Sequence, residues 1–103
     1  MGICRHFLVE GRVQGVGFRA FVRREAKKLK LVGWVRNLKD GQVEILAQGS
    51  EESLALLEIK LKEGPEGSRV ENVLVNSVTC VELELDFIIE LDGETSCQFA
   101  RVK

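Results

Sequence analysis

The chain has 103 residues and a formal net charge of −1, with 45% hydrophobic and 30% charged side chains. A domain of this length can bury a core without disulfides or metal ions. The near-neutral charge argues against a general nucleic-acid coat protein, which would be basic. The sequence has no apolar run of roughly 20 residues, the length that crosses a bilayer, and Glu10 and Arg12 interrupt the N-terminal apolar stretch. We therefore expect a single soluble, cytoplasmic domain over residues 1–103.

The three cysteines, Cys4, Cys80 and Cys97, include no CxxC pair. An odd number of such residues in a cytosolic chain predicts reduced thiols that pack as small apolar side chains. A Cys80–Cys97 disulfide, which would require the C-terminal strands to pair, is the less favoured alternative. Because His6 is the only histidine, we expect no metal site.

Hydrophobic patterning predicts regular elements in the first half of the chain. Alternation over 4–10 predicts a strand, and apolar side chains at helical spacing over 18–29 predict a helix with a basic opposite face. Gly33 ends this helix and begins a strand over 34–38. The Asp40-Gly41 pair then predicts a tight turn into a strand over 42–48.

A second helix follows, with Ser50 as its expected N-cap and Gly64-Pro65 as its end. Valines over 70–75 predict a return to extended backbone. The order strand, helix, strand, strand, helix, strand is that of two interlocked βαβ units, which make a ferredoxin-like α+β sandwich. We expect two helices on one face of an antiparallel sheet.

The C-terminal third extends this pattern. Strict alternation over 81–89, an Asp92-Gly93 turn and a strand pattern over 96–102 predict an extra strand or hairpin. A long apolar strand needs cover or a partner. We therefore expect the extension to pack on the open sheet face or to join two copies, giving a monomer or a dimer through the C-terminal strands.

Residues 11–19, Gly-Arg-Val-Gln-Gly-Val-Gly-Phe-Arg, lie between the first strand and the first helix. Gly15 and Gly17 allow positive φ and a close approach of the backbone to an anion. The first helical turn offers unpaired N–H donors, and Arg19 adds a planar guanidinium that matches phosphate oxygens two at a time. Spacing alone fits a phosphate-binding loop or an ordinary glycine turn, since Ala20 stands where a dinucleotide motif has its third glycine.

This segment and Gly33-Trp34-Val35-Arg36-Asn37 together resemble the signature pair of the acylphosphatase family. The resemblance covers roughly residues 5–75 and implies the ferredoxin-like fold. It also implies hydrolysis of an acyl phosphate to a carboxylate and inorganic phosphate, without metal or cofactor. It places the catalytic arginine at Arg19 and the catalytic asparagine at Asn37. The implied phosphate-binding residues are Gln14, Gly15, Val16, Gly17, Phe18 and Arg19.

These residue types suit the reaction. A carboxylate is a weakly basic leaving group, so catalysis depends on positioning and charge stabilisation more than on a strong acid. Arg19 would absorb charge on the phosphoryl oxygens, and Asn37 would orient the attacking water without adding negative charge. We expect Arg12 and Arg36 to be solvated, and His6 to lie on the open face of the sheet.

Two alternative functions share this fold. A very similar Val-Gln-Gly-Val-Gly-Phe-Arg run occurs in the N-terminal domain of the carbamoyltransferase that matures nickel–iron hydrogenases, which implies carbamoyl phosphate as an alternative substrate. A non-catalytic binding module is the other alternative. RNA-binding sheets of this fold need exposed aromatic residues on central strands, and the strand over 42–48 has none. We therefore expect a small-molecule acyl phosphate, and no nucleic acid, as the partner.

Overall fold

The computed structural model describes residues 2–80 and 86–93. The predicted strands and helices over 4–75 are present at closely similar bounds. The predicted strand over 96–102, and the hairpin that it would form, lie outside the described residues. The elements in chain order are β1 (Ile3–Arg12), α1 (Phe18–Lys28), β2 (Val32–Asn37), β3 (Val43–Gly49), α2 (Glu51–Glu63), β4 (Arg69–Val78) and β5 (Phe87–Ile89).

The strands form one sheet in the order β4-β1-β3-β2-β5. The pairs β1–β3, β1–β4 and β2–β3 are antiparallel, as expected, but β5 pairs in parallel with β2. The sheet is therefore mixed and not wholly antiparallel. The reason is topological, because β4 ends at the end of the sheet where β2 begins. β5 also begins at that end, since Phe87 pairs with Gly33 near the start of β2, so the two strands run in the same direction.

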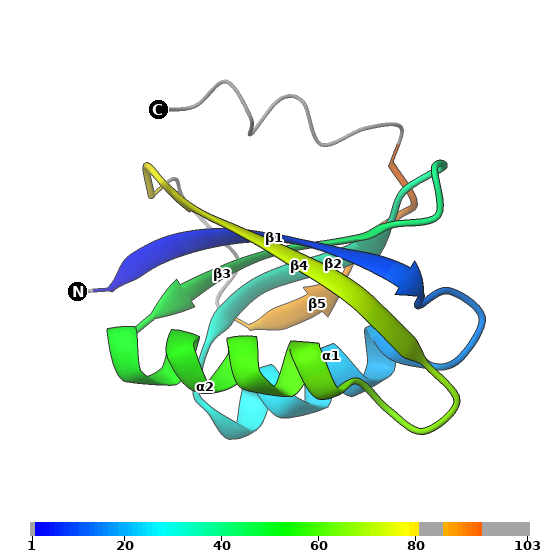
Figure 1. Ribbon diagram of the computed structural model, residues 1–103. Helices are drawn as coiled ribbons and strands as arrows, with labels where there is room; N and C mark the ends of the chain where they lie inside the picture. The colour runs from blue at the N-terminus through cyan, green and yellow to red at the C-terminus, as the bar shows by residue number, and fades with distance from the viewer. Residues whose placement is uncertain (1, 81–85, 94–103) are drawn as a thin grey trace.

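Both helices cover the same face of the sheet, as the sequence predicted (Figure 1). The core lies between the two layers, and the alternating residues of the strands point into it. Phe87 of β5 is fully buried there, so the fifth strand extends the core beyond β2. Helix α1 contributes Phe18, Phe21, Val22 and Ala26, and α2 contributes Leu54, Leu57 and Leu61.

The other face of the sheet carries a buried polar cluster that the sequence analysis did not find. His6 lies on this face, as expected, but it is 3% exposed, and Glu44 is fully buried. Nε2 of His6 lies 2.7 Å from one carboxylate oxygen of Glu44, and Nε of Arg36 donates to the other at 2.6 Å. The Arg36 guanidinium also lies 5.1 Å from the ring centre of Trp34. Arg36 is thus an ion-pair partner and not the solvated side chain that we expected.

Cys4 and Cys80 form a disulfide, so the prediction of three reduced thiols is wrong. Cys4 of β1 pairs with Val78 at the end of β4, which brings Cys80 within reach. The Cα atoms of the two cysteines are 5.2 Å apart, inside the ordinary range for a disulfide. The bond joins the end of β4 to β1, and it also excludes the alternative bond between Cys80 and Cys97.

Within residues 2–80 and 86–93, no helix combines the length and the apolar character needed to cross a membrane.

The buried cluster predicts a specific effect on stability. Glu44→Gln keeps the shape of the side chain but removes the charge that His6 and Arg36 contact. Breaking a buried ion pair costs about 3–5 kcal/mol, and the amide keeps part of the hydrogen bonding. We expect the free energy of unfolding in urea to fall by about 2–4 kcal/mol. The control is Glu66→Gln, at an exposed loop carboxylate. A loss no larger than that of the control would show that the cluster does not stabilise the sheet.

Candidate active site

The loop between β1 and α1 depends on two glycines in the left-handed region. Gly15 and Gly17 both have φ of 76°. A Cβ at either position would meet nothing within 4 Å. Backbone conformation, and not space, therefore requires glycine, since an L side chain in this region costs roughly 1–2 kcal/mol.

No side chain of the described residues caps the N-terminus of α1. Gly17 is its N-cap and makes no capping hydrogen bond, and the first turn contains no acidic residue. Helix α2 differs in both respects, because Ser50 Oγ accepts a hydrogen bond from the Ser53 N–H at 3.1 Å and two glutamates occupy the first turn. The donors and partial positive charge at the start of α1 are therefore open to an anion.

Gln14 anchors this loop to the turn after β2. Its Nε2 donates to the carbonyl oxygens of Leu38 and Gln42, each at 2.8 Å. The family resemblance implies phosphate binding by the Gln14 backbone N–H, and the Gln14 side chain fixes the loop against the β2–β3 hairpin.

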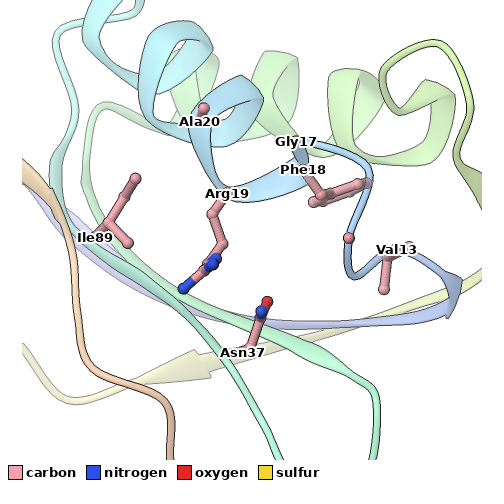
Figure 2. Close-up of a pocket in the computed structure, with 8 residues that line it drawn as sticks. Val13, Gly17, Phe18, Arg19, Ala20, Asn37 and Ile89 are labelled. Carbon is pink, nitrogen blue, oxygen red and sulfur yellow. The ribbon is translucent and has the colours of Figure 1, made fainter.

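Figure 2 shows the cavity that the loop, the start of α1 and the end of β2 enclose. Its volume is about 250 Å³. The Arg19 side chain from α1 and the Asn37 side chain from β2 approach each other across it. The cavity brings together five of the predicted residues, whereas Gln14 and Val16 do not line it. The full lining is Val13, Gly15, Gly17, Phe18, Arg19, Ala20, Asn37 and Ile89.

Ile89 is the lining residue that sequence reasoning missed. It belongs to β5, in the extension that we had placed apart from the motif. Alternation over 81–89 indicated a strand, but no local signal shows that this strand lies beside β2. Val13 lies within the motif over 11–19 and Ala20 directly follows it, so the position of the motif could have indicated both as lining residues.

The two polar side chains of the cavity have contrasting surroundings. Nη1 of Arg19 lies 3.3 Å from Oδ1 of Asp92, and both side chains are exposed, at 39% and 64%. Such exposed pairs are worth about 0–1 kcal/mol, so a ligand can displace Asp92. Oδ1 of Asn37 is buried, and no described residue makes a hydrogen bond to it. A buried acceptor without a partner calls for a water or ligand at that position.

The segment 86–93 runs along α1 and supports the cavity from the side. Nε of Arg23 donates to the Phe87 carbonyl at 3.0 Å, and Nζ of Lys27 lies 3.4 Å from the Asp86 carboxylate. The backbone N–H of Phe87, together with Lys27 and Arg23, holds the pKa of Asp86 below its usual value. The Gly93 N–H donates to the Asn37 carbonyl at 2.9 Å. This bond fixes the end of β2 without using the Asn37 side chain.

A family model described as Acylphosphatase matches residues 5–89. The chain belongs to the acylphosphatase family. A relative named Acylphosphatase from Koribacter versatilis (strain Ellin345) is 58% identical over 71 residues. The matched region is 69% of this chain and 64% of that relative, so it spans just under two thirds of the relative's length.

Two solved structures resemble the chain closely. The acylphosphatase from Bacillus subtilis has a TM-score of 0.82 and 44% identity, over 85% of this chain and 98% of that one. Full-length HypF, in a phosphate- and nucleotide-bound form, has a TM-score of 0.85 and 32% identity. That match covers 93% of this chain but only 13% of HypF. Together these comparisons confirm the predicted family and the ferredoxin-like fold.

Proposed function

We propose that this chain hydrolyses the carboxyl–phosphate bond of acyl phosphates, the reaction of its family, with Arg19 and Asn37 as catalytic residues. One observation carries the proposal. The Arg19 guanidinium and the Asn37 amide meet across a cavity at the one helix N-terminus that the described chain leaves without a side-chain cap (Figure 2).

The substrate's phosphoryl group binds at the start of α1. Its oxygens accept hydrogen bonds from backbone N–H groups and from the Arg19 guanidinium, which neutralise charge at fixed positions. The left-handed φ of Gly15 and Gly17 supports this role, and so does the lack of an acidic residue in the first turn. The residues proposed to supply the N–H groups are Gln14, Gly15, Val16, Gly17, Phe18 and Arg19.

Asn37 positions the water. Its buried Oδ1 accepts a hydrogen bond from the water, whose oxygen attacks phosphorus in line with the bond to the acyl oxygen. A new phosphorus–oxygen bond forms, the old one breaks, and its electron pair leaves on the carboxylate. The water proton passes to a phosphoryl oxygen, giving inorganic phosphate. The charge stabilisation comes from Arg19 and the backbone, so this mechanism uses no metal.

Arg19→Gln should reduce kcat/KM on acetyl phosphate at least about 100-fold, because a charge-assisted bond is worth roughly 1.5–3 kcal/mol before transition-state gains. Inhibition by inorganic phosphate should weaken as well, because the guanidinium also binds phosphate in the ground-state complex. Lys60→Gln, at an exposed lysine of α2, is the control. If the two variants were equally active, Arg19 would not be catalytic.

Asn37→Ala should reduce kcat about 100- to 1,000-fold while KM and phosphate inhibition stay close to wild type. The reason is that an amide which orients water acts mainly in the transition state. The substitution breaks no hydrogen bond among the described residues, so the melting temperature should change little. Steady-state kinetics and a thermal melt test both points. A raised KM with normal kcat would instead place Asn37 on the substrate.

Asp92→Asn should strengthen inhibition by inorganic phosphate about two- to fivefold, because phosphate no longer displaces a carboxylate from Arg19. The competitive inhibition constant is the measurement. Glu90→Gln removes the same charge two residues away and serves as the control for a general field effect. Equal changes in the two variants would show that the Arg19–Asp92 contact has no specific role.

Carbamoyl phosphate is a second candidate substrate. The observation that favours it is the run from Val13 to Arg19, which is very similar to the run in the N-terminal domain of the hydrogenase-maturing carbamoyltransferase. Carbamoyl phosphate is itself an acyl phosphate, so the same residues would act on it. A kcat/KM for carbamoyl phosphate more than tenfold above that for acetyl phosphate would favour this candidate.

The proposal also includes a cytoplasmic location, no nucleic-acid partner, and a monomer or a dimer through the C-terminal strands. Size-exclusion chromatography with light scattering decides between monomer and dimer.

A further inference from the structure

A second depression, with a volume of about 620 Å³, lies along α1 beside the active-site cavity. Arg23, Arg24, Lys27 and Lys28 line it, together with Ala20 and Ile89. Ala20 and Ile89 also line the active-site cavity, so the two hollows meet at these side chains. We call the second hollow the basic groove. No carboxylate is among its described lining residues.

The groove has an excess of positive charge although the whole chain has a net charge of −1. Arg24 and Lys28 share a single carboxylate, Glu25, through loose contacts of 3.9 and 3.6 Å. Both cations remain more than half exposed, at 58% and 65%. In the described chain, two cations therefore face the solvent with one negative charge between them.

The helix dipole accounts for only part of this pattern. Cations in the last turn of a helix face its negative end, which explains Lys27 and Lys28. Arg23 and Arg24 lie in the middle of α1, where the dipole gives no such advantage. Arg23 also donates to the Phe87 carbonyl, which places its guanidinium beside β5 at the edge of the cavity.

Resting on the proposed function, we infer that the preferred substrates are acyl phosphates whose acyl group carries a second anionic group, which binds in the basic groove. With the phosphoryl group at Arg19, the acyl chain crosses Ala20 and Ile89. Arg24 and Lys28, the two solvent-facing cations of the groove, lie five and nine residues along α1 from Arg19, which is about 7.5 and 13.5 Å at 1.5 Å per residue. A short aliphatic chain that ends in a carboxylate spans this separation.

The test compares hexanoyl phosphate with the monophosphate of adipic acid, which has the same number of carbons and ends in a carboxylate. The quantity measured is the ratio of kcat/KM for the adipoyl compound to kcat/KM for the hexanoyl compound. In the double variant Arg24→Gln/Lys28→Gln this ratio should fall at least about threefold, since each exposed ion pair contributes a factor of up to about 5. The matched control is Lys60→Gln/Lys62→Gln, which removes two exposed charges from α2.

Ionic strength provides an independent measurement on the unaltered protein. Salt screens exposed charges, so the ratio should also fall between low salt and about 1 M salt, where the screening length is about 3 Å. A ratio that changes less than threefold in the groove variant, or that changes equally in the α2 variant, overturns the inference. If the protein hydrolyses neither compound, the proposed function is overturned instead.

Discussion

The open N-terminus of α1 is the constraint on which the site depends. A missing side-chain cap costs a helix about 1 kcal/mol, and the chain supplies such a cap to α2 through Ser50 but not to α1. Gly17, in a left-handed conformation, takes the place of the cap. A carboxylate in the first turn would satisfy the helix and occupy the anion site. The sequence thus leaves the N-terminus of α1 without a cap until an anion binds.

Hydrogen bonds at the end of β2 hold Asn37 and the anion-binding loop in place while leaving the Asn37 side chain available to a ligand. Backbone bonds position Asn37, because its carbonyl accepts from the Gly93 N–H and the Lys39 N–H donates to the Gly93 carbonyl. Gln14 ties the anion-binding loop to the same hairpin. These contacts converge at the end of β2, so movement of the loop relative to Asn37 would break several hydrogen bonds. The position of Asn37 relative to the loop is therefore fixed by the Gln14 side chain and by backbone groups of the hairpin, none of which takes part in the chemistry.

Periodicity and glycine placement predicted the two-layer fold, and the two motifs predicted Arg19 and Asn37, which the structure brings to one cavity. The neighbour and direction of β5 could not be predicted, because alternation identifies a strand and its faces but not its partner. The Arg36–Glu44 pair could have been predicted, because each residue lies four positions from Asp40 in the turn. Residues at equal distances from a hairpin turn face each other across the two strands. His6 and the Cys4–Cys80 bond depend on the register of β1 with strands far along the sequence.

Charged residues have different roles on the two faces of the sheet because they differ in burial. Glu44 is fully buried, and His6 and Arg36 contact its carboxylate. Loss of either partner would leave a buried charge without compensation, which is costly. The cluster therefore fixes the register of β1, β2 and β3. On the helix face, Arg19 and Asp92 remain solvated, and their ion pair is weak enough to open. Arg19 can therefore exchange a carboxylate for a phosphoryl group without moving the backbone that holds it. A buried pair at this position would have stabilised the fold and blocked the site.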